Sequence, residues 1–129
     1  MAERDQVNIG VLGAGNVGSS VLEHFYSSSD RLSQAVGIPV NIRRVLVRHA
    51  QKPRAVTLSN GVLTTSLDDI IDDPEINLVV SLLGSENIER SAISKAIMRG
   101  KHVVTANKVV IAKHGPELIA TAGHNGVGL

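Results

Sequence analysis

Short apolar runs alternate along this chain with segments whose apolar residues recur at helical spacing. The run at 7–12, "VNIGVL", is unbroken and bounded by polar residues, a pattern typical of a parallel strand buried on both faces. Similar runs lie at 40–47, 78–83 and 102–105, and a shorter one lies at 62–64. The pattern therefore predicts a series of short strands separated by helical segments.

A helical pattern follows the first strand directly. Val17, Val21 and Phe25 recur at the spacing of one helical face, and most residues between them are polar. We expect the "SSSD" stretch at 27–30 to break this helix, and a short helical turn to run from there to Val36.

The later helical segments carry start and stop signals. Ser66 and Asp69 have the spacing of a capping box, which predicts a short helix that ends at the following Asp-Pro pair. A longer apolar pattern predicts a helix over 86–99, ended by a glycine. Asn107 is expected to cap a further helix, and the Gly-Pro pair at 115–116 is expected to separate that helix from a last one.

Strands that alternate with helices imply crossover connections, and hence a parallel sheet. The predicted fold is α/β, a Rossmann-type doubly wound parallel sheet with helices on both faces, and 1–129 forms one domain. The final residues, "NGVGL", resemble a turn followed by the opening of a strand. We therefore expect a piece of a longer polypeptide, truncated before its last strands and before a catalytic domain.

Composition restricts the classes of function. With 43% hydrophobic and 19% charged residues and a net charge of +1, the chain is globular and has no field that would favour nucleic acid or an anionic membrane. It contains no cysteine, and its histidines are scattered, so we expect no metal site. No apolar run reaches the roughly 18 residues of a membrane span, and "MAERDQ" is unlike a signal peptide. We expect a cytoplasmic protein.

A glycine motif lies where the first strand passes into the first helix. The G-x-G-x-x-G pattern comprises Gly13, Ala14, Gly15, Asn16, Val17 and Gly18. Its glycines permit a tight turn, close approach of a pyrophosphate to the backbone, and close packing of helix on strand. Free amides at the helix N-terminus would meet the phosphates. This context predicts dinucleotide binding, and a turn that serves packing alone is the alternative.

The end of the second strand bears on which dinucleotide is bound. An acidic residue there would accept hydrogen bonds from the adenosine ribose, but this chain has Arg48. A guanidinium suits a 2′-phosphate, and Lys52 and Arg54 offer further donors. We expect NADP(H) to be preferred, with NAD(H) possible; the alternative is that 48–54 is an ordinary solvated loop.

In an open parallel sheet, ligands lie beyond the carboxyl ends of the strands. The segments 81–84 and 105–108 are such ends, so we expect Leu82, Leu83 and Gly84 to contact the cofactor. Lys108 is aimed at the same crevice, where an ammonium could polarise a substrate carbonyl or relay a proton during hydride transfer. Alternatively, Lys108 is an exposed residue in the first turn of a helix.

At these residues the chain resembles a known family. The segments "GKHVVTANK", "VVIAKHGPEL", "DPEINLVVSLLG" and "VRHAQKPR" are similar to the nucleotide-binding domain of homoserine dehydrogenase, and the likeness covers essentially the whole chain. That family interconverts L-homoserine and L-aspartate 4-semialdehyde with NAD(H) or NADP(H), in the route to threonine, methionine and isoleucine.

The resemblance implies roles for particular residues. It places the phosphate turn on 13–18, the cofactor arginine on Arg48 and the catalytic lysine on Lys108, with Thr105 and Asn107 lining the nicotinamide side. Ser81 is a departure, because family members commonly carry glutamate there. The resemblance also implies a further substrate-binding and dimerisation region, through which the full-length enzyme forms a homodimer. We expect the present chain to bind nucleotide but to be inactive on homoserine alone.

Other interpretations stay open from the residues themselves. Another two-domain NAD(P)-dependent enzyme, such as an aspartate dehydrogenase or a sugar oxidoreductase, would use the same nucleotide fold, although the "TANKV" segment disfavours the sugar enzymes. A non-catalytic NAD(P)-sensing module would need no lysine in the crevice. A module that binds CoA is a more distant possibility.

Overall fold

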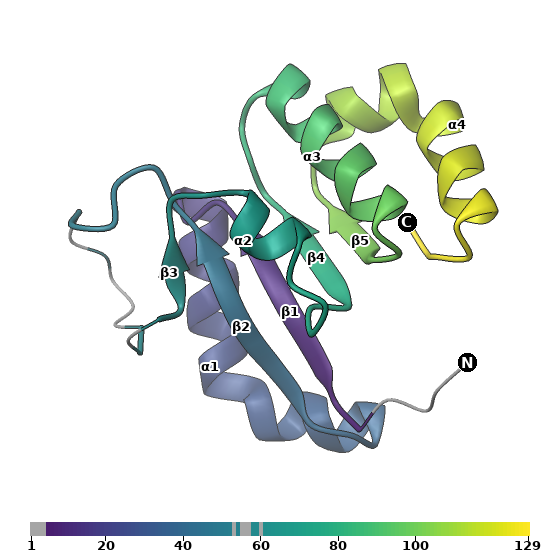
Figure 1. Ribbon diagram of the computed structural model, residues 1–129. Coiled ribbons are helices and arrows are strands. Elements are labelled where there is room, and N and C mark those ends of the chain that lie inside the picture. The colour runs from purple at the N-terminus through teal and green to yellow at the C-terminus, as the bar shows by residue number, and fades with distance from the viewer. Residues whose placement is uncertain (1–4, 53, 55–57, 60) are drawn as a thin grey trace.

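A computed structural model describes residues 5–52, 54, 58–59 and 61–129, and these form a single sheet with helices packed against it (Figure 1). Strands and helices alternate along the chain as the hydrophobic pattern predicts, except that no helix separates the second and third strands among the described residues. In order they are β1 (Val7–Leu12), α1 (Asn16–Val36), β2 (Val40–Leu46), β3 (Leu63–Thr64), α2 (Asp68–Ile71), β4 (Leu78–Ser81), α3 (Glu86–Met98), β5 (His102–Thr105) and α4 (Lys108–His124).

All strands of the sheet run parallel, in the order β3-β2-β1-β4-β5. This is the strand order of the Rossmann fold, in which the chain leaves the first strand toward one edge and later returns to build the other. The register aligns the strand ends, because Leu12 pairs with Leu46 and Ser81, and Ser81 pairs with Thr105. The loops that follow these residues therefore emerge together along one edge.

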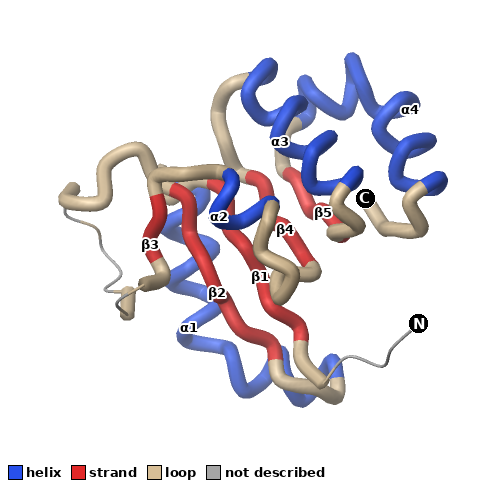
Figure 2. The backbone as a smooth tube through the Cα atoms, in the orientation of Figure 1, coloured by secondary structure: helices blue, strands red, loops and turns tan. Residues whose placement is uncertain are grey.

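Helices cover both faces of the sheet, so the predicted doubly wound fold is confirmed (Figure 2). On one face Leu22 and Phe25 of α1 join Val11 and Val45 in a buried apolar cluster. On the other face α2, α3 and α4 bury a second cluster around Val79. Each fully buried aliphatic side chain contributes about 1.5–3 kcal/mol to this packing. No helix in the described part of the chain combines the length and hydropathy of a membrane span.

Helix α1 is continuous, so the predicted break at 27–30 is wrong. The hydroxyl of Ser27 donates to the carbonyl of His24 at 3.0 Å, within the helix itself. Serine is only mildly unfavourable inside a helix, and its hydroxyl can bond to a backbone carbonyl one turn back without ending the helix. The helix ends where predicted, at Gly37, which adopts a left-handed φ of 88° and donates to the carbonyl of Ser33.

The buried face of α1 also differs by one position from the prediction. Gly18, Leu22 and Phe25 face the sheet, whereas Val17 is 57% exposed. The close approach of the helix at Gly18 turns the preceding valine outward.

Helix α4 runs through the Gly-Pro pair at 115–116, so the predicted separation into two helices is wrong. Proline there removes one backbone donor. Val110 before the pair and Leu118 and Ala122 after it are buried in the same cluster, which holds both halves on one axis. The predicted N-cap is confirmed, because the side-chain oxygen of Asn107 accepts from the backbone N–H of Val110 at 3.1 Å.

Helix α2 forms as expected, but its predicted capping box does not. No side chain caps it, and the hydroxyl of Thr64 instead donates to the Asp69 carboxylate and accepts from the Ser66 N–H.

The final residues also differ in part from the expected turn and strand. The turn is present at Gly126, which has a φ of 67°, but residues 127–129 form no strand. The carbonyl of Gly128 nevertheless accepts from the N–H of Val103 at 3.0 Å, so this segment lies along β5.

Candidate functional site

The glycine turn joins β1 to α1 at the carboxyl edge of the sheet. Gly13 has a φ of 98°, which side chains disfavour, and a Cβ there would lie 2.9 Å from the carbonyl oxygen of Leu82. A Cβ on Gly18 would lie 2.2 Å from the carbonyl oxygen of Gly13. Both glycines are therefore required by the fold itself. Gly15 differs, because a Cβ added there would meet no atom within 4 Å, and its α-carbon faces open space.

The N-terminus of α1 is suited to an anion. Its N-cap, Gly15, supplies no side-chain cap, and its first turn contains no acidic residue. The first amides of a helix have no intrahelical acceptor and carry the positive end of the helix dipole. The nearby hydroxyl of Ser19 donates to the carbonyl of Ala14 at 2.8 Å and so holds the turn closed. Backbone amides, rather than side chains, are thus available to phosphate oxygens.

A cleft of about 800 Å³ opens over this turn. Its volume lies in the usual range for small-molecule and cofactor sites. Of the residues expected to contact a cofactor, those that line the cleft are Gly13, Ala14, Gly15, Asn16, Arg48, Leu82, Leu83 and Gly84. Those outside its lining are Val17, Gly18, Thr105, Asn107 and Lys108. Other residues that line the cleft were not predicted from the sequence, among them Ser19, His49, Ser85 and Ile88.

The loop after β2 supplies positive charge to one end of the cleft. Arg48 and Lys52 line it, and both are exposed. Arg48 forms no hydrogen bond or ion pair with any residue that the structure describes, so its guanidinium is available to a ligand. Arg54 is engaged otherwise, because it donates to the backbone carbonyls of His49 and Lys52 and so braces the loop. Pro53, in the same predicted loop, lies outside the described residues.

The ends of β4 and β5 form a closed polar cluster behind the other end of the cleft. The carboxylate of Glu89, in α3, accepts from Ser81 at 2.9 Å, from Thr105 at 3.1 Å and from the side-chain amide of Asn107 at 2.6 Å. Glu89 is completely buried. A carboxylate therefore does lie at the end of β4, although residue 81 itself is a serine.

Glu89 was missed by the sequence analysis, yet the sequence holds a signal for it. Glu89 falls on the same helical face as Ala92, Ile93 and Ala96, all of which are buried. A glutamate at a position that the periodicity assigns to the core needs polar partners. Its neighbour Ile88, although apolar, is 55% exposed and lines the cleft.

Lys108 begins α4, directly after the Asn107 cap. Its side chain is exposed and has no hydrogen-bond or ion-pair partner among the described residues. It is thus free to meet a ligand, but it stands beyond the lining of the cleft rather than in it.

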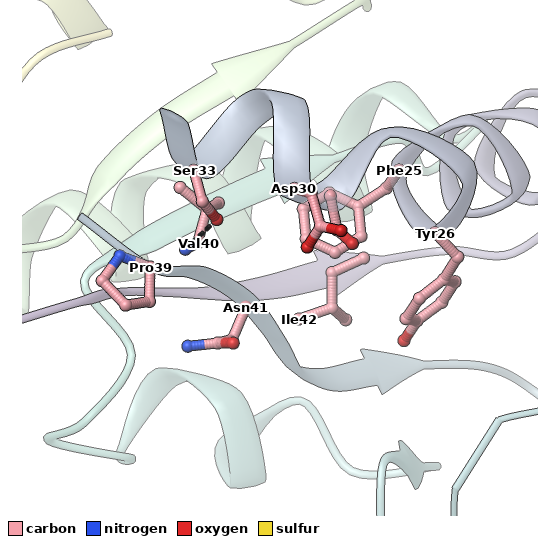
Figure 3. A pocket seen from close by; sticks show the side chains of 9 residues that line it. Phe25, Tyr26, Asp30, Ser33, Pro39, Val40, Asn41 and Ile42 are labelled. Carbon is pink, nitrogen blue, oxygen red and sulfur yellow. Dashed lines mark hydrogen bonds between the residues drawn. The ribbon is translucent and has the colours of Figure 1, made fainter. Parts of the chain in front are cut away.

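A second cleft, of about 470 Å³, lies at the opposite edge of the sheet. Figure 3 shows Phe25, Tyr26 and Asp30 of α1 above Asn41 and Ile42, near the start of β2. Its charged lining residue is an aspartate, which repels phosphate, and it is remote from the carboxyl ends of the strands. Within the described residues there is also no group of His, Asp and Glu placed to hold a metal ion.

The strand order, the glycine turn and the cleft together define a Rossmann-type dinucleotide-binding domain. A family model for the NAD-binding domain of homoserine dehydrogenase matches residues 13–129. The chain belongs to the homoserine dehydrogenase family and corresponds to this domain of it. The predicted resemblance is therefore confirmed.

Individual relatives agree with the family match. The homoserine dehydrogenases of Bacillus subtilis and Synechocystis sp. are 42% and 46% identical over 93% and 94% of this chain. A solved homoserine dehydrogenase structure from Thiobacillus denitrificans covers 95% of the chain with a TM-score of 0.85 and 39% identity. In each case the chain spans 28% of the relative's length. These comparisons favour neither another dehydrogenase class nor a nucleotide sensor.

Proposed function

We propose that this chain binds NADP(H), and NAD(H) less tightly, in the cleft over the glycine turn. The observation that carries the proposal is the contrast among the glycines of that turn. Gly13 and Gly18 are fixed by close backbone contacts, whereas Gly15 is open toward solvent at the uncapped N-terminus of α1. A pyrophosphate can approach the backbone there without meeting a side chain, and the residues present thus fit a dinucleotide.

The proposed preference for NADP(H) is supported by the residues at the end of β2. Arg48 offers planar, charged donors that match a 2′-phosphate, and Lys52 lines the same end of the cleft. No acidic residue lines the described cleft at this end, so nothing there would accept the ribose hydroxyls of NAD(H) in the usual way. Arg54 contributes indirectly by holding the loop carbonyls.

We further propose that Lys108 is the catalytic residue of a homoserine dehydrogenase that acts on L-homoserine and L-aspartate 4-semialdehyde. When bound, the nicotinamide would supply or accept the hydride. The Lys108 ammonium would hold the carbonyl oxygen of the substrate and stabilise the negative charge that develops on it. Support comes from the exposed, unengaged amine at the start of α4, beside the carboxyl end of β5. Val17, Thr105 and Asn107 are proposed to contribute to the cofactor site around these groups.

The complete enzyme is proposed to be a cytoplasmic homodimer that carries its substrate-binding and dimerisation region beyond this domain. The relatives that match this chain are more than three times its length, which is the basis of that proposal. The 129 residues alone are expected to bind nucleotide and to turn over homoserine negligibly. Measurable reduction of NADP⁺ that depends on homoserine, by the purified chain, would contradict this expectation.

Titration of the chain with NADPH and NADH, followed by nicotinamide fluorescence or calorimetry, tests the cofactor assignment. Arg48→Ala should weaken NADPH binding by about tenfold or more and leave NADH binding unchanged, since only NADPH carries the 2′-phosphate. Arg99→Ala is the matched control, because Arg99 is an exposed arginine paired with Asp72 at the end of α3, away from the cleft. Equal affinity for both nucleotides, unaffected by Arg48→Ala, would defeat the preference.

Lys108 is tested in the complete enzyme. Lys108→Ala should lower kcat by at least roughly a hundredfold while nucleotide affinity is kept, because the amine stabilises charge only as the reaction proceeds. Lys113→Ala is the control, since Lys113 lies in the same helix but pairs with Glu86. Full activity of the Lys108 variant would remove the lysine from the mechanism.

A further inference from the structure

Glu89 has an unusual environment for a charged residue. It lies in the first turn of α3 and is completely buried. No salt bridge with a described residue compensates its charge. Its oxygens accept hydrogen bonds from three neutral side chains, Ser81 at the end of β4 and Thr105 and Asn107 at the end of β5. A buried ionised group is costly unless it is fully hydrogen-bonded, and even then it is seldom the most stable choice for a core position. Stability alone is therefore a weak reason for a glutamate here.

The partners of Glu89 are the residues that shape the loop between β5 and α4. Thr105 donates its hydroxyl proton to Glu89 and accepts from the N–H of Asn107 at 3.1 Å. Asn107 donates its side-chain amide to Glu89 and caps α4 through its side-chain oxygen. One carboxylate thus fixes both the bend of the loop and the orientation of the cap. Lys108 is the next residue along the chain.

The same cluster lies directly behind the cleft. Ser85 and Ile88, in the turn that precedes Glu89, line the cleft, as does Leu82, which follows the Ser81 partner. The cluster therefore connects the cleft wall formed after β4 with the segment that carries Lys108. Fully satisfied buried networks of this kind hold one geometry and resist alternatives.

We propose that Glu89 is a positioning residue for the nicotinamide half of the site. Its carboxylate orients Thr105 and Asn107, and through them directs the start of α4 and the Lys108 amine toward the crevice. This inference rests on the proposed nucleotide-binding function. It concerns only the half of the site remote from Arg48, so the nucleotide-binding function and the positioning role of Glu89 can be tested separately.

The test uses two ligands and the chain as it exists. One ligand is NADPH, and the other is 2′,5′-ADP, which presents the adenosine and its 2′-phosphate without the nicotinamide. Glu89→Gln keeps the size of the side chain but turns an acceptor toward the Asn107 amide into a donor. We expect NADPH to bind roughly tenfold more weakly and 2′,5′-ADP to bind as before. A tenfold loss corresponds to the free energy of about one charge-assisted hydrogen bond.

A compensating variant makes the test specific. In Glu89→Gln/Asn107→Asp the amide and the carboxylate exchange places, so the pair is restored and aspartate still caps α4. This double variant should recover most of the NADPH affinity. Glu86→Gln is the matched control, because Glu86 is in the same helix but pairs with Lys113 and His114 outside the cluster. It should bind both ligands as the unaltered chain does.

The outcomes separate the two proposals. If the unaltered chain binds neither ligand, the nucleotide-binding function itself fails. If it binds both and Glu89→Gln weakens neither, or weakens both equally, the positioning role is overturned. Should Glu89→Gln fail to fold, Ser81→Ala removes one donor and leaves the carboxylate in place; a selective loss in NADPH binding of about threefold is then expected, and no loss overturns the inference.

Discussion

The two ends of the cleft are built in opposite ways. At one end, the loop after β2 presents Arg48 and Lys52 to solvent, and the Arg48 guanidinium has no partner among the described residues. Behind the other end, outside the lining of the cleft, Thr105 and Asn107 are hydrogen-bonded to the buried Glu89. The Arg48 guanidinium thus lacks a hydrogen-bond partner that a ligand could provide, whereas the side chains of the Glu89 cluster already have partners within the protein.

This difference illustrates how one site can use some residues to bind an anion and others to orient a reacting group. An exposed cation binds an anion at little cost to the fold, because it gives up only solvent and side-chain freedom. A reacting group must instead be held to a fraction of an ångström, which requires a rigid support. Substitutions at each end should therefore differ in their consequences, and one at the turn between them should affect both.

Gly18→Ala should have the largest effect, because the turn at which the two ends meet depends on it. The added methyl group would overlap the carbonyl oxygen of Gly13, so the helix must move away from β1. We expect a loss of about 1–3 kcal/mol in the free energy of unfolding, together with loss of nucleotide binding. Thermal unfolding and NADPH titration measure the two effects.

Gly15→Ala is the control for that change. Its Cβ meets no atom within 4 Å, and Gly15 has a φ of −73°, which alanine adopts readily. Stability should be kept while NADPH affinity falls, since the methyl group would enter the cleft. Normal binding by this variant would mean that the phosphates do not approach the turn.

Glu89→Leu and Arg48→Ala should differ in their effect on the free energy of unfolding. Leucine leaves the donors of Ser81, Thr105 and Asn107 facing an apolar side chain, and we expect a loss of about 2–3 kcal/mol in the free energy of unfolding. Arg48→Ala should change the same quantity by less than about 0.5 kcal/mol. Denaturant unfolding of both variants measures the two losses. Equal losses of stability would contradict the proposed difference between the two ends of the cleft.

Arg54→Ala tests whether Arg54 acts on a ligand directly or only supports the loop after β2. Arg54 acts through the loop carbonyls of His49 and Lys52 rather than on a ligand directly. We expect NADPH affinity to fall by about threefold, less than in Arg48→Ala, because a looser loop must be ordered on binding. A loss as large as that of Arg48→Ala would place the Arg54 guanidinium on the phosphate.

The smallest effect is expected far from both ends, at Asp73. Burial raises the pKa of this carboxyl, but hydrogen bonds from Arg43 and the Glu75 N–H, with the charges of Arg43 and Lys101, lower the pKa overall. A lowered pKa in the folded state adds stability above the unfolded-state pKa, and that stability is lost as the pH falls through the folded-state value. Asp73→Asn should therefore narrow the stability difference between neutral and acidic pH, as measured by denaturant unfolding at both. Nucleotide binding at pH 7 should not change.

The strands and the glycine turn could be predicted from the sequence because their signals are local. A short, mostly apolar run such as 78–83, bounded by turn residues, is typical of a buried strand, and a G-x-G-x-x-G pattern at a strand-to-helix corner is typical of a dinucleotide-binding turn. The helix boundaries were less predictable. The serine run in α1 is only a weak breaker, since serine costs little inside a helix. The Gly-Pro pair in α4 is a stronger one, but burial of Val110 before it and Leu118 after it in one cluster holds the helix together.

The sequence alone determined the parallel α/β fold, the glycine turn and the cationic loop after β2, because each depends on neighbouring residues. Only the tertiary structure decided that Ser81, Thr105 and Asn107 share the carboxylate of Glu89, and that Lys108 is not part of the lining of the cleft. Those relations join segments brought together by the register of the sheet. Hydrogen bonds between segments depend on distances in space, which hydrophobic periodicity along one chain does not specify.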